Sequence, residues 1–343
     1  MSGDFTWRDA GRTVVFRRGG VGDAAEILRE QGVDGFGLLS TERALAGAPA
    51  LAEAASEVHE VPPGQVPAAA AALLDALAPP HKASKGVRAR PLAALGGGRV
   101  IDVAKAVAAV SGAEVVAIPT TMSGAEMTGS HRLPAGAEQR ARGTVRPRLV
   151  IADPEAMTSQ PERALRASSM NALAHGADTL YLPLSNPVSE MTALRGAELI
   201  ARALDEERGG RDREALALGS ILCGYAIDSA GMGLHHLACQ TLVRICGTPH
   251  AETNAAVLPH SVALLAERAP EPYERLAAAL GTERDGLARR IEELGRPPRL
   301  RDAGGEGSKR GEAIEAMLQR QELQRVPRPP DRDELTELVA QAW

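Results

Sequence analysis

LAALGGGRVIDVAKAV, residues 92–107, is the stretch with the clearest structural signal in the chain. Its first four residues are apolar, as in a buried strand, and apolar residues then recur at helical spacing from Ile101 to Val107. Three glycines, Gly96, Gly97 and Gly98, join the two segments. Glycine lets a backbone approach a phosphate closely, and a helix N-terminus offers N–H groups and the positive end of a dipole. The stretch therefore predicts a phosphate-binding turn, although it matches neither GxGxxG nor the Walker motif.

Short apolar runs alternate with helical segments on both sides of this turn. We expect strands at 13–16, 36–40, 92–95, 114–118 and 148–152, and helices at 23–31, 42–55, 65–78 and after Gly98. Such alternation is typical of a parallel sheet with helices on both faces. Residues 79–90 combine Pro, Gly and several cations, which predicts an exposed loop. The first half is thus expected to be a Rossmann-like α/β domain over residues 1–155.

The second half shows no strand pattern. Helices are expected at 161–182, 187–204, 213–245, 255–269, 312–323 and 334–343. This predicts an all-α domain over residues 156–343 that follows the α/β domain. The junction of two such domains is a common place for a ligand site.

The composition of the chain indicates which partners it does not bind and in which compartment we expect it. The 343 residues contain 39 Lys and Arg against 44 Asp and Glu, and only three Phe, three Tyr and two Trp. Neither a basic footprint nor a stacking platform for nucleic acid is expected. No apolar run approaches the roughly 20 residues that span a bilayer. The three cysteines form no disulfide framework or CxxC pair, so we expect a cytoplasmic protein without a nucleic-acid or membrane partner.

A second polar loop, IPTTMSGAEMT at residues 118–128, follows the strand expected at 114–118. Loops at the carboxyl ends of parallel strands line the ligand crevice of doubly wound sheets. The hydroxyls of Thr120, Thr121 and Ser123 could bind phosphate or ribose. A threonine-rich turn that only satisfies its own backbone explains the motif equally well.

Histidines gather in the helical half. Asn171 and His175 are four residues apart and share a helical face, His236 lies in GLHHLACQ, and His250 opens HAETN. These side chains are interpreted as a polar cluster that binds a metal or transfers a proton. Structural histidines of a core or a surface are the alternative. HExxH is absent, so a zincin-type protease is not supported.

Together these motifs resemble the iron-containing alcohol dehydrogenase superfamily. The runs GGGRVIDVAK, IPTTMSGAEMT, MNALAHGADTLY, GLHHLACQ and PHAETNAAVLPH occur in the same order, over nearly the whole chain. MNALAH, GLHH and the late PRP are most similar to the maleylacetate reductase branch. The resemblance implies a nicotinamide-dependent oxidoreductase of dehydroquinate synthase-like architecture, with an N-terminal dinucleotide domain and a helical domain. It also implies a homodimer.

The resemblance assigns NAD(P)H contacts to residues of the first half. These are Gly96, Gly97 and Gly98 at the pyrophosphate, Asp102 and Lys105 on the next helix, Thr120 and Thr121 at the nicotinamide half, and Ser40 and Thr41 near the adenosine ribose. An acidic residue at that ribose would repel a 2′-phosphate, whereas hydroxyls do not. Both NADH and NADPH are therefore expected to be accepted.

The resemblance also bears on the metal. Metal-dependent relatives have Asp where this chain has Asn171, together with histidines that match His175, His236 and His250. An amide brings no negative charge, and the Asn variant resembles the maleylacetate reductases. We therefore favour no required iron or zinc; if a metal were bound, the three histidines would be its ligands. Asn171, His175, His236 and His250 are instead expected to bind an acid substrate or deliver a proton.

A maleylacetate reductase would convert maleylacetate to 3-oxoadipate. Hydride adds to a carbon–carbon double bond conjugated with a ketone, so the site must stabilise an enolate and supply a proton to carbon. Candidate side chains for binding the acid substrate are Met122, His131, Arg132 and Arg244.

Alternatives to this function remain. Departures from the branch pattern at Met122, Ala125, 129–132 and Asn254 cluster near the expected pocket. They motivate a divergent dehydrogenase of another hydroxy or keto acid in a specialised biosynthetic pathway, with oxidative decarboxylation of a β-hydroxy acid as one route. A non-catalytic binding or scaffold homologue is a second alternative. A synthase of the same architecture would need a metal, against which Asn171 counts.

Overall fold

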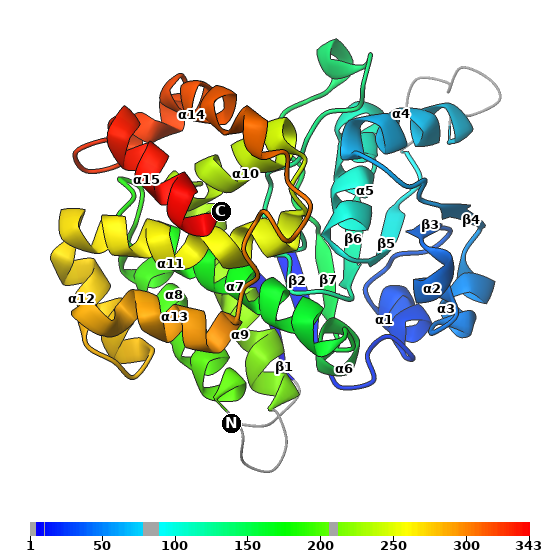
Figure 1. Cartoon of the computed structure of the whole chain (residues 1–343). Coiled ribbons are helices and arrows are strands. Elements are labelled where there is room, and N and C mark those ends of the chain that lie inside the picture. The colour runs from blue at the N-terminus through cyan, green and yellow to red at the C-terminus, as the bar shows by residue number, and fades with distance from the viewer. Residues whose placement is uncertain (1–4, 10, 78–88, 206–211) are drawn as a thin grey trace. The chain divides into compact units, whose positions relative to one another are not determined.

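The computed structural model describes residues 5–9, 11–77, 89–205 and 212–343. The chain forms two compact units, Met1–Ser159 and Gln160–Trp343. All strands found in the described residues belong to the first unit, and the regular elements described in the second are helices (Figure 1). The α/β class predicted for the first half and the all-α class predicted for the second are therefore confirmed.

In the described part of the first unit, a seven-stranded sheet has the order β1-β2-β7-β6-β5-β3-β4. The strands are β1 (Phe5–Asp9), β2 (Arg12–Phe16), β3 (Gly37–Ser40), β4 (Glu57–Glu60), β5 (Leu92–Gly96), β6 (Val115–Pro119) and β7 (Leu149–Ala152). Six of these strands are parallel, and β1 pairs antiparallel with β2 at one edge. The helices are α1 (Ala24–Glu30), α2 (Glu42–Leu45), α3 (Pro49–Ala54), α4 (Val66–Ala76), α5 (Gly98–Ser111) and α6 (Pro154–Met157), with the 3₁₀ turn η1 (Glu138–Arg140).

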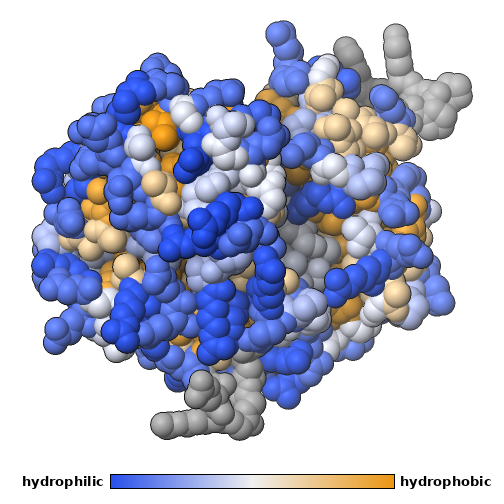
Figure 2. Space-filling view, in the orientation of Figure 1, coloured by the Kyte–Doolittle hydropathy of each residue, from blue (hydrophilic) through white to orange (hydrophobic). Residues whose placement is uncertain are grey.

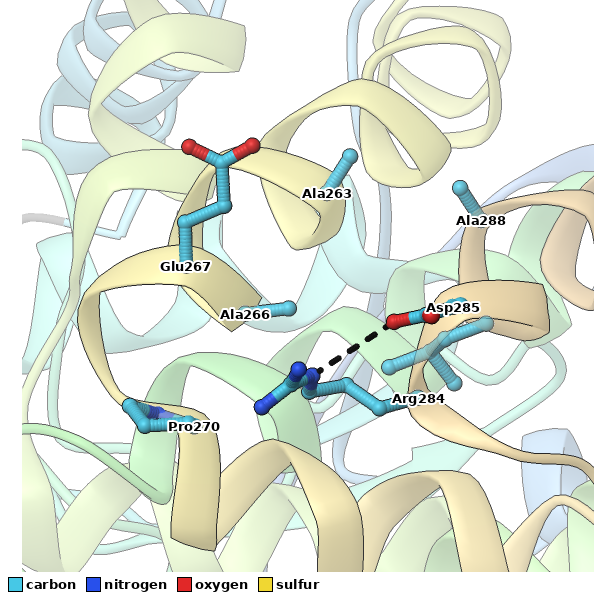
Figure 3. Close-up of a pocket in the computed structure, with 8 residues that line it drawn as sticks. Ala263, Ala266, Glu267, Pro270, Arg284, Asp285 and Ala288 are labelled. Carbon is cyan, nitrogen blue, oxygen red and sulfur yellow. Dashed lines mark ion pairs between the residues drawn. The ribbon is translucent and has the colours of Figure 1, made fainter.

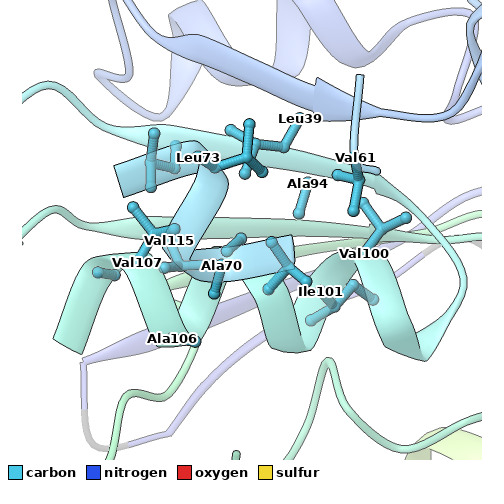
Figure 4. Close-up of a cluster of buried hydrophobic side chains, with 14 of the residues drawn as sticks. Leu39, Val61, Ala70, Leu73, Ala94, Val100, Ile101, Ala106, Val107 and Val115 are labelled. Atoms are coloured by element: carbon cyan, nitrogen blue, oxygen red, sulfur yellow. The ribbon is translucent and has the colours of Figure 1, made fainter. Parts of the chain in front are cut away.

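The interior strands are apolar throughout because both faces of the sheet are covered. In β5, Leu92 and Ala94 belong to a core cluster that includes residues of α4 and α5 (Figure 4). Ala93 and Leu95 belong to a second cluster, which includes residues of α1 and α3. Successive side chains of a strand point to opposite faces, so helices cover both sides of the sheet, as predicted.

The first unit differs from the prediction in two places. The helix expected at 42–55 is two helices, because Pro49 occupies the first turn of α3 and cannot continue α2. The edge strands β1 and β4 were missed. In β4 the sequence EVHE is polar and alternates between half-buried and exposed positions, which is common at a sheet edge. Most of the loop expected at 79–90 lies outside the described residues.

The second unit contains nine α-helices in its described part. They are α7 (Glu162–Thr179), α8 (Pro187–Leu204), α9 (Arg213–Ala230), α10 (Leu234–Cys246), α11 (His250–Arg268), α12 (Pro270–Ala279), α13 (Leu287–Gly295), α14 (Arg310–Leu318) and α15 (Arg332–Ala342). The 3₁₀ turns are η2 (Arg284–Gly286), η3 (Gly307–Lys309) and η4 (Gln321–Arg325). No helix was predicted over α12 or α13, and α12 begins with a proline at its first position.

The single helix expected at 213–245 is wrong. Helices α9 and α10 meet at an angle of 96° at Gly231-Met-Gly233. Gly231 has φ +88°, a conformation that glycine adopts without a Cβ clash. The break places the N-terminus of α10, with His235 and His236, at a bend in the chain.

Hydrophilic side chains cover most of the face in Figure 2, with apolar patches between them. Among the described residues, the large exposed apolar side chains are Val58, Leu184, Val188 and Met191; two of them lie at the start of α8, and Leu184 precedes that helix. No single helix in the described ranges has the length and apolar character needed to cross a membrane; α9 and α10 reach that threshold only as a bent pair.

Candidate functional site

The glycine turn between β5 and α5 packs directly against the Thr-rich loop after β6. A Cβ on Gly97 would lie 3.1 Å from Cγ2 of Thr121, and one on Gly98 would lie 2.7 Å from Cβ of Ser123. The backbone N–H of Thr120 donates to the carbonyl of Gly96 at 3.0 Å. The structure therefore brings together the two loops that the sequence singled out.

This turn fits the pyrophosphate of a dinucleotide. Gly97 is the N-cap of the 14-residue α5, and no side chain caps the helix there. The first N–H groups of a helix have no partner within the helix, and its dipole favours an anion. A turn without Cβ atoms lets a phosphate approach these N–H groups.

Lys105 and Glu126 lie buried beside this turn. Lys105 Nζ donates to Asp102 Oδ1 at 2.9 Å and to the Ala125 carbonyl at 3.0 Å, so Lys105 supports the loop from within the protein. Glu126 Oε2 accepts from Ser123 Oγ at 3.3 Å, and Oε1 has no partner among the described residues. Burial raises the pKa of Glu126 to about 7, against the opposing effects of its hydrogen bonds and of Lys105. Glu126 was not predicted, because its only signal in the sequence is a charge in an otherwise uncharged loop.

The two residues predicted to contact the ribose, Ser40 and Thr41, differ in burial and in hydrogen bonding. Ser40 is fully buried, and its hydroxyl donates to the Leu95 carbonyl at 2.7 Å. That hydroxyl is thus occupied within the sheet, which does not support a ribose contact by Ser40. Thr41 is the N-cap of α2, is partly exposed and makes no capping hydrogen bond.

Asp153, which was not predicted, accepts from the N–H groups of Gly19 and Val21 at 3.2 and 3.1 Å and holds the Gly19 turn.

In the second unit, α7 and α10 bring two histidines into ring contact. His175 and His236 are both buried, and their rings stack with centroids 4.7 Å apart. His236 Nδ1 lies 2.7 Å from Oδ2 of Asp178, one turn beyond His175 on α7. Within the described residues, neither His236 Nε2 nor His175 Nδ1 has a hydrogen-bond partner. Two buried imidazole nitrogens therefore have an unused hydrogen-bonding position.

The buried histidines and Asp178 differ in the charge they carry at neutral pH. Burial lowers the pKa of His175 well below 6.5, and the neighbouring histidines lower it further. Burial also lowers the pKa of His235 to about 3. Burial alone would raise the pKa of Asp178, but the hydrogen bond from His236 and the nearby imidazoles outweigh it, so that pKa lies below its usual value. At neutral pH the site holds an ionised Asp178 and neutral His175 and His235.

The remaining candidates of the second unit lie on α7, α10 and α11, and His250 is close enough to lower the pKa of His175 and of His235. Asn171 is buried on α7, one turn before His175. His250 is exposed at the start of α11; its carbonyl accepts from Asn254, whose Oδ1 lies 3.0 Å from His235 Nε2. Arg244 is exposed in the last turn of α10.

The candidates of the first unit do not form one cluster of free polar groups. Met122 is fully buried. His131 is half-buried, with Nδ1 3.1 Å from the carbonyl of Arg132. Arg132 is exposed and donates to Gln65 Oε1 at 3.1 Å.

Comparison with known proteins identifies the family. Residues 166–343 match the family model "Fe-containing alcohol dehydrogenase family, C-terminal", and residues 15–161 match "Iron-containing alcohol dehydrogenase". Maleylacetate reductase of Burkholderia cepacia is 35% identical over 267 residues, covering 73% of each chain. That of Rhizobium sp. (strain MTP-10005) is 31% identical over 99% of this chain and 97% of its own. The chain belongs to the iron-containing alcohol dehydrogenase family.

The solved structures agree with this assignment. The crystal structure of maleylacetate reductase from Agrobacterium tumefaciens has a TM-score of 0.81 at 30% identity, covering 100% of this chain and 99% of that one. The predicted resemblance is confirmed, and the chain is an NAD(P)-dependent oxidoreductase similar to maleylacetate reductases.

The family name implies iron, but the residues here do not fit a metal. An imidazole binds a metal through the in-plane lone pair of a ring nitrogen about 2.1 Å from the ion. The stacked rings of His175 and His236 lie only 9° from parallel, so their lone pairs do not converge on one point. Asn171 offers a neutral amide. In the portions of the chain that the structure describes, no group of three His, Cys, Asp or Glu side chains is arranged to hold a metal ion.

A hollow of about 520 Å³ lies elsewhere in the second unit (Figure 3). Its lining comes from the end of α11, the start of α12, η2 and α13. None of His175, His236 and His250 is among the lining residues. Arg284 points across it and pairs with Asp285 at 3.7 Å and with Glu274 at 3.2 Å. We therefore do not take this hollow as the active site.

Proposed function

We propose that this protein reduces an unsaturated keto acid, maleylacetate to 3-oxoadipate, with NADH or NADPH and without a required metal. The observation that carries the proposal is the buried His236 imidazole, whose Nε2 has no partner in the described residues and which lies against neutral His175. Similarity to maleylacetate reductases supports the substrate class.

The reduced nicotinamide, when bound, supplies a hydride to the carbon–carbon double bond of the substrate. The electron pair of that bond moves onto the conjugated ketone oxygen. His236 Nε2 delivers the proton that carbon then needs, and solvent returns a proton to the imidazole. His175 and Asn171 contribute hydrogen bonds, which favour negative charge as it develops on the oxygen. The hydride forms one new C–H bond and reduces the substrate by two electrons. The proton forms the second C–H bond.

We infer that the cofactor pyrophosphate binds at Gly96, Gly97 and Gly98, because the helix behind them is uncapped and their Cβ positions are closed. Thr120 and Thr121, on the adjoining loop, contact the nicotinamide half. Thr41 contacts the adenosine ribose, and its hydroxyl does not repel a 2′-phosphate. Substrate carboxylate contacts by His131, Arg132, Arg244 and His250 stay predictions, as do a cytoplasmic location, a homodimer and the lack of a nucleic-acid or membrane partner.

The test is turnover of two substrate types by one preparation. We expect loss of NADH and NADPH absorbance with maleylacetate, and 3-oxoadipate as the product. Turnover only in the oxidative direction, with a β-hydroxy acid and release of carbon dioxide, would replace the proposal by a divergent dehydrogenase. Failure to bind either nucleotide would favour a scaffold homologue.

A further inference from the structure

Among the side chains around His175 and His236, Asp178 accepts hydrogen bonds from the largest number of donors. Oδ2 accepts from the N–H of Gly233 at 3.1 Å, the N–H of His236 at 3.2 Å and Nδ1 of His236 at 2.7 Å. Oδ1 accepts from the N–H of His235 at 3.3 Å and from Tyr181 Oη at 3.2 Å. Asp178 itself is fully buried on α7.

This arrangement fixes which nitrogen of His236 carries a hydrogen. Backbone N–H groups only donate, so both Asp178 oxygens act as acceptors and the carboxyl group is ionised. A hydrogen bond of 2.7 Å to such an oxygen requires a proton on Nδ1. Nε2 is then the nitrogen that accepts or releases a proton, and it is the one that has no partner among the described residues.

We propose that Asp178 is a positioning residue of the reduction: it holds His236 in the Nδ1–H form and aims Nε2 at the substrate. The inference rests on the proposed function for the identity of the reaction, but the tautomer is a property of the protein alone.

A purely structural role is the competing explanation, because Asp178 also caps the N-terminus of α10. Tyr181 shares that second role, since its hydroxyl accepts from the Leu234 N–H at 2.6 Å and bonds to Asp178. The Tyr181 hydroxyl bonds to Asp178 and Leu234 and not to the His236 ring, so Tyr181→Phe removes part of the cap and leaves the imidazole bond in place. It is the matched control for Asp178→Asn.

The experiment combines histidine ¹⁵N NMR on the ligand-free full chain with steady-state kinetics. His236→Gln assigns the His236 signals. We expect the wild-type spectrum to show a proton on Nδ1, and Asp178→Asn to move it to Nε2. We expect kcat to fall about 10²- to 10⁴-fold in Asp178→Asn, with the cofactor KM within about threefold. Asp178→Glu restores the Nδ1–H signal and part of kcat, and Tyr181→Phe keeps the signal with less than about a tenfold loss.

A wild-type His236 that carries its proton on Nε2 would overturn the proposal, even if Asp178→Asn failed to fold. Equal kcat losses in Asp178→Asn and Tyr181→Phe, with the Nδ1–H signal unchanged in both, would reduce Asp178 to a helix cap. Failure of the proposed function has a different signature, because maleylacetate would then not turn over in a wild type with the expected tautomer.

Discussion

At the scale of single residues, the close approach of Gly98 and Ser123 joins the glycine turn after β5 to the loop after β6. A Cβ on Gly98 would lie 2.7 Å from Cβ and 2.8 Å from Oγ of Ser123, so Gly98→Ala must displace the loop after β6. Overpacking of this kind costs about 1–3 kcal/mol, which predicts a cofactor KM raised roughly 10- to 100-fold.

Steady-state kinetics with varied NADH test this contact. The double variant Gly98→Ala with Ser123→Gly removes both clashing atoms and is expected to recover most of the affinity. Gly47→Ala is the control in the same unit, because its nearest neighbour would lie at an ordinary 3.5 Å. An unchanged KM in Gly98→Ala would show that the cofactor binds elsewhere.

Single residues also mark what the sequence can and cannot predict. The Gly96–Gly98 turn was predictable because strand, glycines and helix are contiguous. Asp178 and Glu126 were not, because an isolated acid gives no local signal and its role comes from groups far along the chain. Asp178 lies three residues after His175, and that spacing was the one hint of a shared helix face.

At the scale of elements, the start of α10 depends on a glycine at Gly233. A Cβ there would lie 2.0 Å from Tyr181 Oη and 2.7 Å from Asp178 Oδ1. Gly233→Ala must therefore break the hydrogen bonds that hold α10 to α7, and we expect it to lower the free energy of unfolding by about 2–4 kcal/mol.

Urea unfolding followed by circular dichroism measures this cost. Adding Tyr181→Phe to Gly233→Ala removes the nearer obstacle, so the double variant is expected to lose less than the sum of the single losses. Strict additivity would mean that the Tyr181 hydroxyl does not constrain the entry to α10.

Elements were predicted well where periodicity alone sets them, as for α8 over Pro187–Leu204. The break between α9 and α10 was missed because both helices continue the apolar pattern, and only the backbone of Gly231 reveals it. Strand β4 was missed because a polar edge strand lacks the apolar run that identifies interior strands.

At the scale of the whole molecule, the two units have opposite responses to pH. The pKa of Glu126 is raised from 4.5 to about 7, so the folded first unit binds the extra proton and its stability falls as pH rises through that window. The pKa of His235 is lowered from 6.5 to about 3, so the second unit loses stability as pH falls through that window.

Hydrogen-exchange mass spectrometry, corrected for the intrinsic pH dependence of exchange, resolves the two responses. Between pH 4.5 and 7 we expect protection of the β5–α5–β6 peptides to decrease and that of α10 peptides to increase. Glu126→Gln should remove the first trend and keep the second. Parallel trends in both units would contradict this assignment of buried charges.

We propose that imidazole chemistry, without a metal, reduces an unsaturated keto acid at this site. The most direct measurement is maleylacetate reduction by enzyme treated with a strong chelator, with the metal content of the same sample determined by mass spectrometry. We expect kcat to be unchanged by the treatment and to be lost in His236→Gln. Activity that disappears with the chelator and returns with one equivalent of iron or zinc per chain would contradict it.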